Sequence, residues 1–234
     1  MIVVGSTIPA WKMDEAGYWA SWLLNAEQIA ASHPDLLEVR FIAVLELDAR
    51  GREPFAPLLA RIADLRGIVW TFSLDDGAMV ITGSNRLVRI CTGRNLISQY
   101  ARDHHATHVL FADADTMIPG DAIPKLLELD WPIVGGEVPT YALHLGPQGP
   151  VEGYPFPVVQ RNNTAGFLLV ASELFRRLSW RVDVAAGMTD DPCYAADAIA
   201  AGYPTRVRCD VVGAHWPPSI GPVEQRGHDL VVRR

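Results

Sequence analysis

The chain has 234 residues, which is enough for one large α/β domain with a sizeable core. A hydrophobic fraction of 49% and a charged fraction of 20% are those of an ordinary globular protein. The formal net charge of -7 argues against a general nucleic-acid binder, although four arginines fall within one short stretch: Arg86, Arg89, Arg94 and Arg102.

The three cysteines, Cys91, Cys193 and Cys209, are widely spaced and form neither a CxxC pair nor a disulfide framework. A reducing, cytoplasmic location is therefore expected. The first residues lack a basic segment followed by a long apolar run, so no signal peptide is expected. No window reaches the apolar length of a membrane span.

Strand and helix patterns alternate along the first half of the chain. Short apolar runs predict buried strands over residues 1–5, 39–47 and 67–74. Apolar residues at helical spacing predict helices over residues 14–32 and 54–65. The alternation predicts a single-domain α/β fold, with a mostly parallel central sheet and helices on both faces.

The second half continues the alternation around one long irregular segment. Gly93 is expected to open a helix over residues 94–102, and Ser172 to cap a short one. The remaining expected strands are residues 108–112, 131–138, 165–171 and 206–212, and another helix is expected over residues 120–129. Residues 141–160 are rich in proline and glycine, as lids and binding loops often are.

Asp113 and Asp115 stand at the carboxyl end of the strand that begins at His108, with only Ala114 between them. Residues i and i+2 of an extended chain point to the same side, so the two like charges are expected to lie close together. A hard divalent cation relieves their repulsion and completes its shell with water and substrate phosphates. The pattern predicts a metal site for a phosphorylated substrate, and an acidic turn is the alternative.

Arg94 is expected at the start of its helix, where anions bind and where an arginine pairs with phosphate or carboxylate. The alternative is a surface arginine with Asn95 as a helix cap. In either case the helix leads directly into the strand that carries Asp113.

Thr189-Asp190-Asp191-Pro192 is expected to begin the last helix, with proline at its first position and Gly202 beyond its end. One of the two aspartates is explained as an N-cap, and the other is a candidate general base for an acceptor hydroxyl. His215 follows the last strand and is a candidate metal ligand, with His228 as its competitor.

The order and spacing of these segments resemble glycosyltransferases of the GT-A (Rossmann-like) fold, and most closely the family-2-like enzymes that contain an Asp-x-Asp motif. The likeness spans most of the chain. It is carried by residues 2–9, 93–95, 109–115, 133–136, 166–170, 189–194 and 213–215.

In such enzymes the Asp-x-Asp pair holds a divalent metal on the diphosphate of a nucleotide sugar, and an acidic pair that opens a helix faces the acceptor. The resemblance implies that Asp113, Asp115 and His215 bind the metal, and that Asp191, with Asp190, is catalytic. The implied nucleotide-sugar contacts are Thr7, Ile8, Pro9, Glu46, Arg94 and Asp113. Asp191 would deprotonate the acceptor in an inverting reaction and would position it in a retaining one.

The resemblance thus implies a hexosyl- or pentosyltransferase that uses Mn²⁺ or Mg²⁺ and a nucleotide-diphosphate sugar, with a UDP-sugar as the expected donor. The nucleotide-binding part would be about residues 1–115 and the acceptor-binding part about 116–234. The acceptor stays open among a small molecule, a glycan, a protein and modified bases of viral DNA, the last because of the arginine cluster.

Two other interpretations remain. Residues 113–116 also resemble the first motif of haloacid-dehalogenase-like phosphatases, in which Asp113 would be a nucleophile. That family needs a lysine ahead of its acidic motif, but this chain has only Lys12 and Lys125. The family also usually starts near its nucleophile strand, whereas here several strands and helices are expected before Asp113. The second alternative is a non-catalytic nucleotide-sugar-binding domain.

Overall fold

The computed structural model describes ten segments of the chain: residues 1–14, 18–32, 39–65, 67–73, 85–138, 149–161, 166–183, 185–215, 223–226 and 229–232. His228 and residues 141–148 of the expected irregular segment lie outside the described residues.

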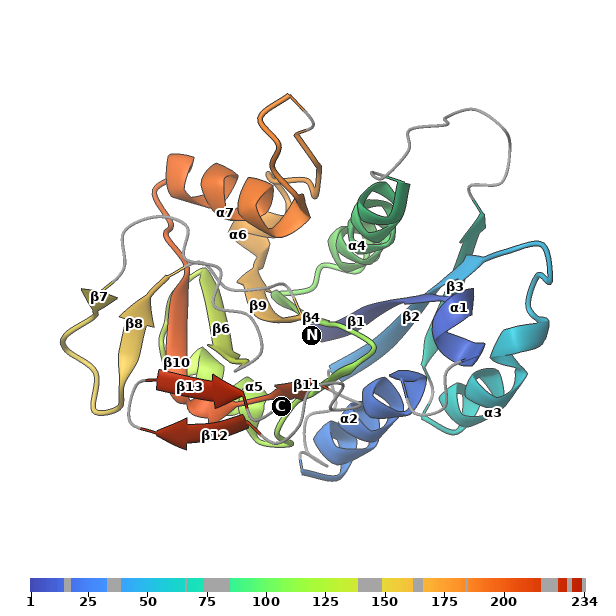
Figure 1. The fold of residues 1–234 in the computed structure, drawn as a ribbon, viewed down its shortest axis with the longest axis horizontal. Helices are drawn as coiled ribbons and strands as arrows, with labels where there is room; N and C mark the ends of the chain where they lie inside the picture. The colour runs from blue at the N-terminus through green and yellow to red at the C-terminus, as the bar shows by residue number, and fades with distance from the viewer. Residues whose placement is uncertain are drawn as a thin grey trace.

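Within these segments, a central mixed sheet has the strand order β3-β2-β1-β4-β9-β6-β10-β8-β7 (Figure 1). Its strands are β1 Ile2–Pro9, β2 Val39–Leu47, β3 Ile68–Ser73, β4 His108–Ala112, β6 Ile133–Glu137, β7 Gly149–Pro150, β8 Val158–Gln160, β9 Phe167–Ala171 and β10 Arg206–Val212. The half from β3 to β4 is parallel, whereas β9 runs antiparallel to both β4 and β6. Two two-stranded sheets pair β5 Thr116–Met117 with β11 Ala214–His215, and β12 Val223–Arg226 with β13 Asp229–Val232.

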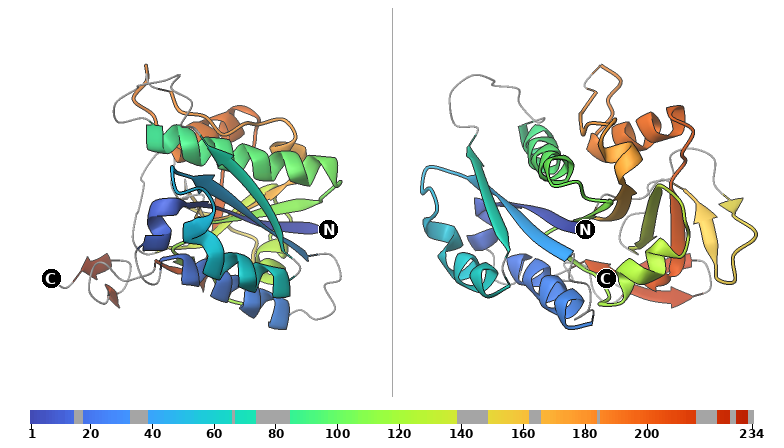
Figure 2. Two further views of the ribbon diagram at one scale, coloured as in Figure 1. Left: turned by 90° about the vertical axis from the view of Figure 1, so that its right-hand side faces the viewer. Right: turned by 180° about the vertical axis from the view of Figure 1, so that it is seen from behind.

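Helices cover both faces of the large sheet, as predicted (Figures 1 and 2). The helical segments are α1 Ala10–Asp14, α2 Tyr18–Ser32, η1 Glu53–Phe55, α3 Ala56–Asp64, α4 Asn85–Asp103, α5 Ala122–Leu127, α6 Ser172–Phe175 and α7 Asp190–Ala200. One core cluster includes Trp22 of α2, Leu58 of α3 and Ile123 of α5. A second includes Ile97 of α4 and Tyr194 of α7, so each sheet face has its own apolar layer. None of the described helices is long and apolar enough to cross a membrane.

The helix expected over residues 94–102 in fact begins at Asn85, so Gly93 and Arg94 lie inside α4 rather than at its start. Gly93 has a packing role instead, because a Cβ atom there would overlap the side chain of Thr7 in β1. A glycine that permits close contact between helix and strand reads, in sequence, like a glycine at a helix end.

Other boundaries differ for local reasons. The first strand continues to Pro9 instead of stopping at Gly5, because β1 pairs with β2 as far as Glu46. Ser172 is the first residue of α6 rather than its cap. Pro150 lies in β7 at the edge of the sheet, where proline removes no ladder hydrogen bond, so residues 149–160 are more regular than their composition suggested.

The position of the site follows from the strand order. The chain passes outward from β1 through β2 to β3 and then returns to β4 on the other side of β1. The carboxyl ends of β1 and β4 therefore flank the point where the strand order reverses. Open α/β sheets bind their ligands in the crevice at such a point.

Candidate functional site

Asp113 follows β4 directly and is held in a tight turn. Its backbone N–H donates to the carbonyl of Gly166 at 3.1 Å, and its own carbonyl accepts from Thr116 N–H at 3.0 Å. The two aspartates thus lie on a turn, which is the alternative stated above, and the spacing of an extended strand does not apply to them. The Asp113 side chain is 44% exposed and that of Asp115 only 11%, and each has a basic partner of its own.

Arg94 binds three carboxylates that come from distant parts of the chain. Its Nη2 lies 3.0 Å from Asp113 Oδ1, and its Nη1 lies 2.5 Å from Asp190 Oδ2 and 2.9 Å from Asp191 Oδ1. The guanidinium is a planar fork that donates in several directions at once, and α4 places it between the end of β4 and the first turn of α7. One side chain therefore joins the Asp-x-Asp turn to the acidic pair.

The surroundings of Arg94 fix its charge. Only 5% of its side chain is exposed, and the guanidinium lies 4.7 Å from the centre of the Trp180 ring. Burial alone lowers the pKa of Arg94, but the charges of Asp191, Asp113 and Asp190 outweigh burial and raise it. Asn95 is not a helix cap, because its side-chain amide exchanges two 2.9 Å hydrogen bonds with the backbone of Trp180.

Asp190 and Asp191 are the first two residues of α7, where the helix dipole favours negative charge. The N-cap position belongs to Thr189, and Pro192 is third, so Asp191 does not cap the helix. The cluster also affects Cys91 on α4, since burial and then the charge of Asp190 raise the pKa of its thiol to about 12. The Cys91 thiol is therefore protonated and is not a nucleophile at neutral pH.

Lys12 of α1 is the basic partner of Asp115, and their side chains are 9% and 11% exposed. The ion pair joins the segment after β1 to the turn after β4, across the point where the strand order reverses. The ammonium of Lys12 thus offsets the charge of Asp115, a role that the sequence pattern assigned to a metal ion. Together Asp113, Asp115, Asp190, Asp191, Lys12 and Arg94 carry a net formal charge of -2.

Asn25 of α2, whose side chain is almost wholly buried, stabilises the turn after β4 by hydrogen bonds to its backbone. Its amide donates to the carbonyl of Thr116, and its Oδ1 accepts from Ile118 N–H at 2.6 Å. β11 pairs with β5 so that His215 lies opposite Thr116, next to Asp115 in the chain. The backbone thus brings His215 to the Asp-x-Asp turn, while its side chain lies outside the described structure.

The other predicted nucleotide contacts differ in how deeply they are buried. Ile8 is wholly buried in the core, so its side chain does not face a ligand. Pro9 and Glu46 pair in register at the carboxyl ends of β1 and β2, and Glu46 accepts from Arg89 at 2.8 Å. The Thr7 hydroxyl is buried against Gly93 and has no hydrogen-bond partner among the described residues.

The donor set permits a divalent cation at Asp113 but does not form a complete metal cage. Among the described residues, no three His, Cys, Asp or Glu side chains are placed to hold a metal ion. Gly166 leaves room beside the second oxygen of Asp113, since a Cβ atom there would lie 2.9 Å from Oδ2. One exposed carboxylate, in a cluster whose net formal charge including its own is -2, suits Mg²⁺ or Mn²⁺, which keep waters and substrate phosphates as further ligands.

Sequence reasoning missed Lys12, Asn25 and Gly166. Asn25 lies within residues 14–32, whose apolar spacing predicts a helix and not a site, and Lys12 lies just before that segment. The chain contains only two lysines, Lys12 and Lys125, and Lys12 stands three residues after the first strand ends. That position is the signal that could have found it, because a parallel sheet exposes polar groups at the carboxyl ends of its strands.

No model of a known protein family matches the chain, and no curated protein does. Among solved structures, the nucleoside-diphosphate-sugar pyrophosphorylase of Vibrio cholerae RC9 superposes with a TM-score of 0.53 at 10% identity, over 91% of this chain and 92% of that one. The chain has the GT-A fold. The fold class predicted from sequence is therefore confirmed.

Two glycosyltransferases superpose less closely. An active-site mutant of LgtC matches with a TM-score of 0.45 at 19% identity over 76% of this chain, which spans only 60% of LgtC. A glycosyltransferase involved in the glycosylation of the major capsid of PBCV-1 matches with a TM-score of 0.43 at 11% identity, over 93% and 95% of the two chains. Three strands precede the Asp113 strand in this sheet, whereas haloacid-dehalogenase-like phosphatases usually start near their nucleophile strand.

Breaking the buried pair at Asp115 is expected to be costly. Lys12→Met leaves a buried carboxylate without its ammonium and should lower the free energy of unfolding by about 3 to 5 kcal/mol. The double variant Lys12→Met/Asp115→Asn removes both charges and should recover most of that loss in urea denaturation. Arg50→Met, which breaks the exposed Arg50–Asp48 pair, should cost under about 1 kcal/mol, and an equal loss in Lys12→Met would contradict the assignment.

Proposed function

We propose that this chain is a glycosyltransferase that moves a sugar from a nucleotide-diphosphate sugar, with a UDP-sugar as the expected donor, to an acceptor hydroxyl. The observation that carries the proposal is the three-carboxylate contact of Arg94. Through this contact the half-exposed Asp113, at the carboxyl edge of the sheet, lies close to Asp190 and Asp191 at the start of α7. Glycosyl transfer needs a site that stabilises the leaving diphosphate, and an inverting enzyme also needs a base near the acceptor.

On the donor side, Asp113 is the proposed ligand of Mg²⁺ or Mn²⁺, with His215 as a further ligand brought to the turn by β11. A bound divalent ion would neutralise the charge that grows on the diphosphate as the glycosidic bond breaks. Lys12 pairs with Asp115 and fixes its position, so in this proposal Asp115 shapes the turn and is a weaker candidate ligand than Asp113. Arg94 orients Asp113 and adds positive charge behind it.

On the acceptor side, Asp191 is the proposed base, and its side chain is 18% exposed against 8% for Asp190. In an inverting reaction the acceptor oxygen bonds to the anomeric carbon, its proton goes to Asp191, and the nucleoside diphosphate leaves. Asp190 is a positioning residue that fixes Arg94. In a retaining reaction Asp191 would only orient the acceptor.

We place the nucleotide-binding part at about residues 1–115 and the acceptor-binding part at about 116–234. The division follows the site, since Lys12, Arg94 and Asp113 precede the boundary and Asp190, Asp191 and His215 follow it. A small molecule, a glycan, a protein and modified DNA remain candidate acceptors.

A second candidate is nucleotidyl transfer, which joins a nucleoside triphosphate to a sugar phosphate and releases pyrophosphate. The likeness to the Vibrio cholerae pyrophosphorylase favours it. Against it, β1 runs directly into α1 through Pro9 and Ala10, without the glycine-rich loop whose N–H groups usually cradle a triphosphate. Glycosyl transfer is therefore the preferred function.

Calorimetric titration with UDP, GDP, ADP and CDP, with and without Mn²⁺, tests the proposal. One diphosphate should bind, more tightly with Mn²⁺, and its sugar conjugate should be hydrolysed slowly to the same diphosphate. Pyrophosphate release from a triphosphate and a sugar 1-phosphate would instead establish the second candidate, and aryl-phosphate hydrolysis would revive the phosphatase. Diphosphate binding without any turnover would indicate a non-catalytic binding domain.

Removing the proposed base should affect the chemical step alone. Asp191→Asn keeps the size of the side chain and its contact with Arg94, so donor affinity should change less than threefold while kcat falls about 100-fold or more. Asp197→Asn, on the same helix but paired with the exposed Arg181, is the matched control. A kcat for Asp191→Asn equal to that of the control would exclude Asp191 as the base.

A further inference from the structure

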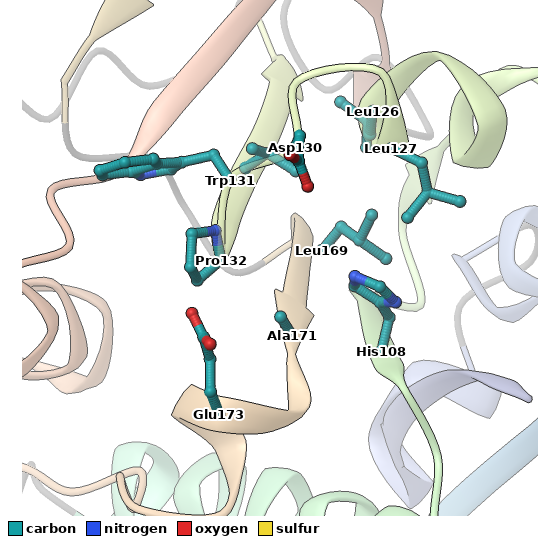
Figure 3. Close-up of a pocket in the computed structure, with 10 residues that line it drawn as sticks. His108, Leu126, Leu127, Asp130, Trp131, Pro132, Leu169, Ala171 and Glu173 are labelled. Carbon is teal, nitrogen blue, oxygen red and sulfur yellow. The ribbon is translucent and has the colours of Figure 1, made fainter.

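A cavity lies at the opposite end of β4 from Asp113. It has a volume of about 280 Å³ and is bounded by the start of β4, the end of β9, α5 and the turn that follows α5. Its apolar wall includes Leu126, Leu127 and Leu169 (Figure 3). A cavity of this volume has space for several water molecules or a short organic chain.

Three polar side chains from different elements point into this cavity (Figure 3). They are His108 at the start of β4, Asp130 in the turn after α5, and Glu173 in α6. Among the described residues, neither carboxylate has an ion-pair partner. The cavity is therefore lined by two exposed carboxylates beside an apolar base, and none of the described residues that line it is a lysine or arginine.

His108, the third polar group, adds a hydrogen-bond acceptor and no positive charge. Burial, and then the positive charge of the N-terminus, lower the pKa of His108. The ring is therefore neutral at pH 7 and accepts a hydrogen bond from an N–H donor through its unprotonated nitrogen. The two carboxylates would repel an anionic ligand and attract a donor-rich cation, and the one positive charge of the N-terminus offsets only part of that attraction.

We propose that this cavity binds a small organic cation, with an ammonium or guanidinium head between Asp130 and Glu173 and a short aliphatic chain against the leucines. The head supplies several N–H donors and its charge offsets both carboxylates. The chain occupies the apolar part of the cavity. The site is separate from the proposed donor site, since the two lie at opposite ends of the same strand.

Calorimetric titration of the full chain with agmatine, which has both kinds of head and a four-carbon chain, tests the site. Asp130 has a φ of 45°, a conformation that asparagine also tolerates, so Asp130→Asn removes charge without straining the backbone. We expect Asp130→Asn and Glu173→Gln each to weaken agmatine binding about fivefold, and the double variant to weaken it more than either. 1-Pentanol, which has the chain without the charge, should not compete.

The matched control is Asp113→Asn, because agmatine could also bind the acidic donor site. Agmatine affinity that falls in Asp113→Asn but not in the Asp130/Glu173 double variant would overturn the proposal, as would an absence of binding to the wild-type chain. A pentapeptide with a single central arginine distinguishes the sources of the cation. Tighter binding of the peptide than of agmatine indicates the side chain of a partner protein, and tighter binding of agmatine indicates a free amine.

Discussion

Arg94→Met is expected to abolish turnover and to lower the free energy of unfolding by about 3 to 5 kcal/mol. The guanidinium is the shared partner of three carboxylates, and Asp190 and Asp191 are largely buried. Without it their charges repel one another in a region with little solvent, and the turn at Asp113 is no longer tied to α7. Urea denaturation measures the first effect, and release of nucleoside diphosphate measures the second.

Arg94→Lys separates charge from geometry. An ammonium keeps the positive charge but does not reach both sides with a planar fork, so stability should largely recover while kcat remains at least about tenfold low. Arg181→Met is the matched control, since Arg181 forms a two-bond pair with Asp197 on the same helix but is 46% exposed. It should cost under about 1 kcal/mol. Full activity in Arg94→Lys would show that the bridge from Asp113 to α7 is not required.

Asp113→Asn is expected to reduce kcat/KM by 100-fold or more and to remove the enhancement of diphosphate binding by Mn²⁺. The amide is a poor ligand for a hard cation, yet its oxygen still accepts from Arg94. Because 44% of the Asp113 side chain is exposed, the free energy of unfolding should change by less than about 1 kcal/mol. Calorimetry with and without Mn²⁺, together with steady-state kinetics, separates the two effects.

Gly166→Ala tests Oδ2 of Asp113, the carboxylate oxygen that does not face Arg94, without removing it. A Cβ atom 2.9 Å from Asp113 Oδ2 must displace the carboxylate, so the variant should lose most of its Mn²⁺ response while it keeps the charge of the site. Gly149→Ala is the control, since no atom of the described part of the chain lies within 4 Å of a Cβ atom there. Mn²⁺ enhancement that survives in both Asp113→Asn and Gly166→Ala would place the metal elsewhere.

Local pattern was sufficient for the α/β architecture and for several boundaries. The strands over residues 39–47 and 206–212 begin and end where their apolar runs predict. Gly202, with a φ of 93°, ends α7 as expected. These features depend on the alternation of apolar and polar residues within one turn or one strand, which is a property of neighbouring residues. The start of α4 was not predicted because Gly93 permits a close contact with β1, and a contact between distant segments leaves no local pattern.

The sequence by itself determined that the acidic groups stand at the carboxyl end of one strand and at the start of the last long helix. Only the tertiary structure decided how their charges are balanced. Lys12 reaches Asp115 across 103 residues, and Arg94 reaches Asp190 across 96. A chain specifies such partners through the order of its strands, because the reversal between β1 and β4 brings together segments that no short-range pattern connects.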